Sequence, residues 1–201
     1  MIIYLHGFSS GANSHKAGIF EKYFKQYEIS IPEYRSHQPR HSVGYLNDYV
    51  RQNAAMSKSP GIMLIGSSLG GYYAQYLANQ HDFIFAAVLI NPCLQPQITL
   101  ASQIGEQLNC VTGKSFYFSE EDYESLAQYD VPRNKLIKST LVLLDQGDEI
   151  IDYRFAQEKY KGKGRVIVYP GGDHWFKHLD QALPEIEMFY KTNVGENLRA
   201  R

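Results

Sequence analysis

The chain has few cysteines, no long apolar run and almost no net charge. Its 201 residues include two cysteines, Cys93 and Cys110, which favour a reducing compartment and which we interpret as buried free thiols. No apolar stretch is long enough to cross a membrane. The net charge of −1 gives no sign of binding to nucleic acid or to an anionic membrane surface.

The N-terminal sequence enters an apolar segment directly, without a basic region or a signal cleavage site, so we expect a cytoplasmic protein. Hydrophobic residues make up 44% of the chain, which is typical of one globular domain with a sizeable core. The last residues, 192–201, lose periodicity and predict a frayed end. The sequence leaves open whether the protein is a monomer or a homo-oligomer.

Short apolar segments alternate with longer helical patterns. Strands are expected at residues 2–5, 28–31, 61–65, 86–90, 140–144 and 166–169. Helices are expected at residues 16–27, 42–56, 71–80, 153–160 and 179–191. This alternation predicts an α/β fold with a mostly parallel six-stranded sheet between two helical layers, a three-layer α/β/α sandwich.

One segment interrupts the alternation. More than forty residues separate the fourth predicted strand from the fifth, and a loop of that length is often functional. Ser119 followed by Asp122 resembles a capping box and predicts a helix over residues 120–129. We therefore predict a single domain, residues 1–201, with a small helical cap inserted at about residues 95–139; an ordinary pair of packing helices is the alternative.

A Gly-x-Ser-x-Gly pattern at Gly66–Gly70 lies between the third predicted strand and a helix. This context is typical of a nucleophile elbow, where glycines allow a strained turn that presents a central serine. Ser68 is therefore the predicted nucleophile, above the N-terminus of a helix.

A serine hydroxyl needs a base and an orienting acid, which in such hydrolases follow in the order Ser, Asp/Glu, His. The loops after the last two strands contain Asp145, Asp148 and Glu149, and then His174. We predict the triad Ser68–His174–Asp148, because Asp148 follows a glycine turn whereas Asp145 directly follows the strand and could enter a backbone network. His178 is the alternative base.

An oxyanion needs two preorganised amides. We predict that they belong to Leu69, directly after the nucleophile, and to Phe8 in the loop after the first strand. Gly7 allows this loop to approach the substrate closely, and His6 is interpreted as a structural residue that supports the loop.

These motifs together resemble the α/β-hydrolase superfamily, and more closely the small bacterial YqiA/YcfP-like esterases. The resemblance covers about residues 2–190. It implies a sheet without the first two strands of larger members, all parallel, in the order 2-1-3-4-5-6. It also implies small acyl esters or thioesters as substrates.

Other residues have weaker assignments. Trp175, with Phe176 and the aromatic residues 116–118, could line an acyl pocket or belong to the core. A group of basic residues could bind an anion or remain a solvated loop: Arg35, His37, Arg40 and His41. Asn91 and Pro92 are expected to shape the floor of the pocket.

We find no metal-ligand spacing, P-loop or dinucleotide fingerprint, so no cofactor is predicted. A serine in the nucleophile position disfavours dehalogenases, which need aspartate, and dienelactone hydrolases, which need cysteine. The favoured function is a serine esterase that prefers short acyl chains. The alternatives are an acyl thioesterase and a non-catalytic binding module on a hydrolase fold.

Overall fold

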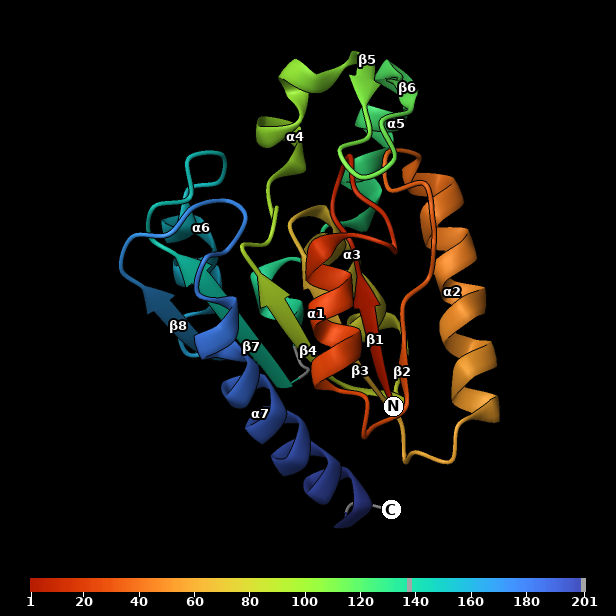
Figure 1. The fold of residues 1–201 in the computed structure, drawn as a ribbon, viewed down its shortest axis with the longest axis vertical. Coiled ribbons are helices and arrows are strands. Elements are labelled where there is room, and N and C mark those ends of the chain that lie inside the picture. The colour runs from red at the N-terminus through yellow and green to blue at the C-terminus, as the bar shows by residue number, and fades with distance from the viewer. Residues whose placement is uncertain (137–138, 200–201) are drawn as a thin grey trace.

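The computed structural model describes residues 1–136 and 139–199. Its central sheet has six strands in the order β2-β1-β3-β4-β7-β8, and all five pairings are parallel. The strands are β1 (Ile2–Leu5), β2 (Ile29–Ser30), β3 (Ile62–Ser67), β4 (Ile84–Ile90), β7 (Ser139–Asp145) and β8 (Arg165–Tyr169). The predicted strands, their direction and their order are confirmed (Figure 1).

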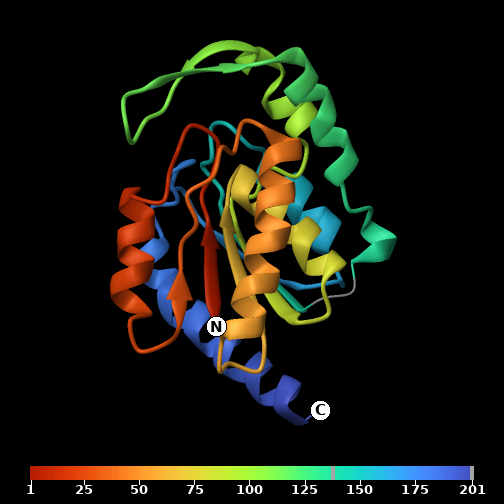
Figure 2. The same cartoon turned by 90° about the vertical axis from the view of Figure 1, so that its right-hand side faces the viewer.

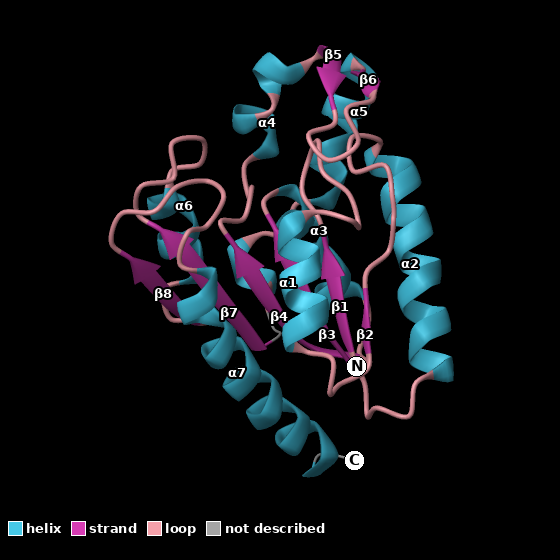
Figure 3. Cartoon of the chain, viewed as in Figure 1, coloured by secondary structure: helices cyan, strands magenta, loops and turns pink. Residues whose placement is uncertain are grey.

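Helices cover both faces of this sheet (Figure 3). One face packs against α1 (His15–Tyr23) and α7 (Leu179–Arg199), and the other against α2 (Pro39–Met56), α3 (Leu69–Gln80) and α6 (Tyr153–Tyr160). Successive side chains of β3 alternate between the two hydrophobic clusters, because side chains on a strand point to opposite faces. Both faces are therefore apolar, as a doubly covered parallel sheet requires.

The segment between β4 and β7 lies over the carboxyl ends of the strands (Figure 2). It contains short helices, as expected: α4 (Pro96–Thr99), η1 (Ala101–Gln103), α5 (Glu120–Ser125), η2 (Leu126–Tyr129) and η3 (Arg133–Lys135). It also contains an antiparallel hairpin that the sequence pattern did not predict, formed by β5 (Gly105–Leu108) and β6 (Ser115–Phe118). Two residues of the predicted cap, 137 and 138, lie outside the described residues.

Ser119 begins α5 as expected, because its hydroxyl accepts the Asp122 backbone N–H at 3.0 Å. The helix predicted over residues 120–129 is α5 followed by the 3₁₀ helix η2. The hairpin escaped prediction because each strand has only four residues, two of them exposed, which is too short for a recognisable strand pattern.

Two expectations about the chain were wrong. The C-terminal segment is helical to Arg199 instead of frayed, since the Asn197 side chain donates to the Pro60 carbonyl at 2.8 Å and Val194 packs on the core. Both cysteines are free, but Cys110 is exposed at the turn of the hairpin and only Cys93 is buried. In the described part of the chain, no helix has the length and apolar character needed to span a membrane.

Candidate active site

Ser68 lies in the turn between β3 and α3, as expected from the strand–turn–helix pattern. Its φ and ψ of 53° and −124° place it in a strained region that residues other than glycine rarely occupy. A Cβ at Gly66 would stand 2.3 Å from the Gly70 carbonyl oxygen, and one at Gly70 would stand 2.2 Å from that of Leu5. Only glycine fits at both positions, so the turn can present Ser68 in this conformation.

Three side chains from separate loops meet at this turn. The Nε2 atom of His174 lies 3.2 Å from Ser68 Oγ, and its Nδ1 atom lies 2.9 Å and 3.1 Å from the two carboxylate oxygens of Asp148. The three residues follow the carboxyl ends of β3, β7 and β8, which share one edge of the sheet. Tertiary structure thus brings together a hydroxyl, an imidazole and a carboxylate that are distant in sequence.

The Asp148 carboxylate is held rigidly. Its side chain is 1% exposed, and Oδ1 accepts the backbone N–H groups of Ile150 and Ile151 at 2.9 Å and 2.8 Å. These donors leave the carboxylate aimed at the imidazole, which is 18% exposed. Glu149, the third candidate acid, contacts the backbone of His174 and not its ring: its carboxylate accepts the His174 backbone N–H at 3.1 Å.

The loop after β1 approaches Ser68 closely. A Cβ at Gly7 would stand 3.1 Å from Ser68 Cβ and 3.6 Å from Ser68 Oγ. The backbone amides of Phe8 and Leu69 donate to no acceptor within residues 1–136 and 139–199. Leu69 is also the first residue of α3, whose N-terminal N–H groups carry partial positive charge. Neither amide therefore has a protein acceptor in the described part of the chain, and Leu69 directly follows Ser68.

His6 packs against this loop. Its ring is fully buried, stacks on Tyr34 with centroids 4.2 Å apart, and lies 3.1 Å from the Gly7 carbonyl oxygen through Nδ1. Burial lowers the pKa of His6, which keeps the imidazole neutral at pH 7. The structural interpretation of His6 therefore agrees with its surroundings.

Asp145 and His178 form a second carboxylate–imidazole pair. His178 Nδ1 lies 2.6 Å from Asp145 Oδ1, and the other carboxylate oxygen accepts the backbone N–H groups of Asp173 and Lys177. Asp145 therefore enters a backbone network, as its position directly after the strand suggested. His178 contacts Asp145 and not Ser68.

Lys16 is a residue of the site that no sequence motif predicted. It lies in the first turn of α1, and its ammonium group donates to the hydroxyl of Ser67, next to Ser68, at 2.8 Å. Burial lowers the pKa of Lys16 to about 8. The negative charges of Asp145, Asp148 and Asp173 oppose this shift. No sequence pattern marks it, because a lysine near a helix start is usually a surface residue.

Three of the four basic residues after β2, Arg35, His37 and Arg40, contact neighbouring side chains. Arg40 pairs with Glu121 of α5 at 2.6 Å, and Arg35 donates to Gln38 at 3.4 Å. His37 stacks on Phe116 with centroids 4.2 Å apart, and burial lowers its pKa. This segment therefore supports the cap through pairs and stacking.

The aromatic candidates divide between surface and core. Trp175 is 70% exposed, directly after His174, whereas Phe176 is buried beside α7. The ring of Phe8 makes edge contacts with Phe116 and Phe118 of β6, at centroid distances of 5.5 Å and 5.1 Å. An aromatic group thus joins the loop after β1 to the cap.

The turn of the cap hairpin also contacts that loop. The backbone N–H of Cys110 donates to the Ser9 carbonyl at 2.8 Å, and the Asn109 side chain donates to the Ser10 carbonyl at 2.9 Å. The cap therefore covers the loop after β1, which contains the Phe8 amide, and limits the space around that loop.

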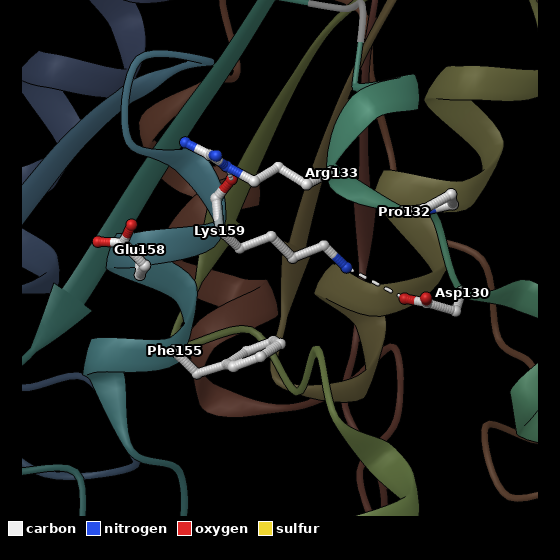
Figure 4. A pocket seen from close by; sticks show the side chains of 6 residues that line it. All are labelled: Asp130, Pro132, Arg133, Phe155, Glu158 and Lys159. Atoms are coloured by element: carbon white, nitrogen blue, oxygen red, sulfur yellow. Dashed lines mark hydrogen bonds and ion pairs between the residues drawn. The ribbon is translucent and has the colours of Figure 1, made fainter.

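A surface hollow of about 390 Å³ lies apart from the triad residues, between the end of the cap and α6 (Figure 4). Lys159 extends across it to pair with Asp130 at 3.0 Å, and Arg133 donates to the Lys159 and Lys161 carbonyls. These contacts attach the cap to α6. Within the described ranges, no group of three or more His, Cys, Asp or Glu side chains could hold a metal ion.

The parallel six-stranded sheet, covered by helices on both faces, is an α/β-hydrolase fold. The similarity to solved structures supports this class: Est1E from Butyrivibrio proteoclasticus with bound ferulic acid matches with a TM-score of 0.77 and 16% identity, over 96% of this chain and 89% of that one. The esterase domain of a Rhodothermus marinus protein matches with a TM-score of 0.73 and 15% identity, over 96% and 87%.

Residues 1–191 match the model of an uncharacterised protein family, UPF0227, and the chain belongs to this family. A UPF0227 protein of Vibrio parahaemolyticus is 27% identical over 196 residues, covering 96% of this chain and 100% of the relative. One of Vibrio vulnificus strain CMCP6 is 25% identical over 197 residues, with the same coverage. These matches confirm, at the level of the family, the resemblance seen in the motifs.

Proposed function

We propose that the protein is a serine hydrolase that cleaves carboxylic esters through an acyl-enzyme intermediate. The observation that carries the proposal is the contact chain from Ser68 Oγ to His174 Nε2, at 3.2 Å, and from His174 Nδ1 to Asp148, at 2.9 Å. This sequence of hydroxyl, imidazole and buried carboxylate is the arrangement that activates a serine nucleophile.

In this mechanism, Ser68 Oγ attacks the acyl carbon while His174 Nε2 takes its proton. Asp148 holds the imidazole in the tautomer with hydrogen on Nδ1 and stabilises the imidazolium that forms. The amides of Phe8 and Leu69 bind the oxyanion of the tetrahedral intermediate. His174 then returns the proton to the departing alcohol and afterwards removes one from the water that releases the acid.

We assign substrate contact to the Gly7 backbone and the Trp175 ring. Gly7 lies against Ser68, and Trp175 follows His174 and is exposed to solvent. The contacts of Phe8 with Phe116 and Phe118, and of the hairpin turn with Ser9, reduce the space above the oxyanion loop. These contacts favour short acyl chains. A small-molecule ester acted on in the cytoplasm is consistent with the two free cysteines.

The test is hydrolysis of p-nitrophenyl esters from acetate to decanoate by the wild type and Ser68→Ala. We expect turnover that is highest for short chains and falls at least about 10³-fold in the variant. Retained turnover in Ser68→Ala would contradict the assignment of the nucleophile. Circular dichroism of both proteins checks that the variant is folded.

The same assay separates the alternatives. Acyl-CoA thioesters test the thioesterase function, and methyl ferulate tests an aromatic ester, since the similar protein Est1E binds ferulic acid. A non-catalytic binding module would turn over none of these substrates and would not react at Ser68 with a fluorophosphonate probe.

A further inference from the structure

The carboxylate of Asp145, the last residue of β7, is fully buried and lies outside the Ser68–His174–Asp148 chain of contacts. Its Oδ2 atom accepts the backbone N–H of Asp173 at 3.2 Å and that of Lys177 at 2.8 Å. These two amides lie on either side of His174. One carboxylate oxygen therefore holds both ends of the short segment that carries the imidazole.

Asn91, at the end of β4, provides a second attachment. Its side-chain oxygen accepts the Asp145 backbone N–H at 2.8 Å, and its side-chain nitrogen donates to the Asp173 carbonyl at 3.0 Å. Asn91 has a φ of 39°, which is uncommon for a residue other than glycine. The buried side chains of Asn91 and Asp145 thus connect the ends of β4 and β7 to the His174 loop.

The loop has little room to move relative to Asp145. A Cβ at Gly172 would lie 1.9 Å from Asp145 Oδ2, so only glycine lets the backbone pass against the carboxylate. The remaining carboxylate oxygen, Oδ1, lies 2.6 Å from His178 Nδ1, and the His178 ring stacks on Tyr169 with centroids 5.0 Å apart. Every oxygen of the carboxylate is therefore engaged in holding this loop and the residues that follow it.

We propose that Asp145 is a positioning residue: with Asn91 and His178, it fixes the His174 loop so that the imidazole stays between Ser68 and Asp148. The kinetic consequences of this proposal depend on the function proposed above. Asp145 acts through backbone amides that flank His174, so its loss displaces the base without removing a group that contacts substrate. A displacement of about 1 Å at a reacting group can reduce the rate about 100-fold.

The first test is Asp145→Asn. Asparagine has the same shape, but it has no charge and only one acceptor oxygen, so it cannot accept from the Asp173 and Lys177 N–H groups and from His178 at the same time. We expect kcat to fall about 10- to 100-fold while KM changes less than about threefold. The matched control is Asp130→Asn, which breaks the ion pair with Lys159 away from the triad residues (Figure 4) and leaves kcat within about twofold.

Two variants of His178 test the same network if Asp145→Asn does not fold. His178→Phe keeps a ring beside Tyr169 but removes the nitrogen that bonds to Asp145, and we expect kcat to fall. His178→Gln retains an N–H donor, and we expect it to recover most of the wild-type kcat. Equal kcat values in the two variants would overturn the role of the Asp145–His178 contact.

A spectroscopic measurement distinguishes this proposal from the proposed function. The proton on His174 Nδ1, shared with Asp148, gives a low-field resonance when it is sheltered from exchange, and its loss in Asp148→Asn assigns it. We expect this resonance to be lost or broadened in Asp145→Asn and unchanged in Asp130→Asn, without any substrate. An inactive wild type that follows this pattern refutes the ester function but retains the positioning role.

A purely structural role gives a different result. Asp145→Asn would then lower the melting temperature, but below that temperature its kcat and its low-field resonance would match those of the wild type. That outcome overturns the proposal.

Discussion

Gly7 lies so close to Ser68 that a Cβ on Gly7 would stand 3.1 Å from the Cβ of the serine. The loop after the first strand and the turn after the third strand therefore share one narrow space. A side chain at position 7 would press on Ser68 and on the Ser67 carbonyl, so it would disturb the oxyanion site that we propose for this loop.

We expect Gly7→Ala to reduce kcat about 10- to 100-fold with a smaller change in KM, because the added methyl group displaces the loop that carries the Phe8 amide. The measurement is the steady-state hydrolysis of the best p-nitrophenyl ester. Gly44→Ala is the control, since a Cβ at that helical position meets no atom within 4 Å. A Gly7→Ala enzyme with wild-type kcat would contradict the requirement for glycine at position 7.

Replacement of Asp148 tests the orienting acid. Asp148→Asn keeps the shape of the side chain but presents an NH₂ group to His174 Nδ1, which favours the wrong imidazole tautomer, so we expect kcat to fall about 10⁴-fold. Asp152→Asn is the control in the same loop, because Asp152 pairs with Arg154 at the surface. A loss of less than about tenfold in Asp148→Asn would contradict the assignment of the acid.

The lowered pKa of Lys16 predicts that the free energy of unfolding depends on pH in the alkaline range. Burial lowers its pKa in the folded protein to about 8 from the usual 10.5, so between these values the folded state releases a proton that the unfolded state keeps. The contribution of Lys16 to the free energy of unfolding therefore rises with pH in this window, by about 1 kcal/mol from pH 8 to pH 9.

The measurement compares the urea unfolding of the wild type and Lys16→Met at pH 7, 8 and 9. The difference in the free energy of unfolding, wild type minus variant, should increase above pH 8, and other titrating groups cancel in this difference. A difference that is constant over the three pH values would mean that Lys16 titrates normally in the folded protein.

Most of the sheet could be predicted because its strands have strong local signals. Residues 2–5 and 62–65 are continuous apolar runs that are buried on both faces, and each is followed by a glycine-containing turn. The cap was predicted less well, since β5 and β6 are short, half-exposed strands stabilised by each other and by the loop at Ser9. The C-terminal helix continues beyond its periodic part because Asn197 bonds to Pro60, a contact 137 residues away in sequence.

Local sequence was enough to predict the succession of strands and helices outside the cap, the sharp turn at Ser68 and the short set of acids and histidines that could act with Ser68. These features depend on residue type and spacing, which the chain carries without folding. The packing of the folded chain then distinguished between the candidate acids. Asp145 and Asp148 are three residues apart, yet one bonds to His178 and the backbone and the other faces His174. Packing also placed Lys16 beside Ser67, because contacts between distant segments depend on how the elements are arranged in space.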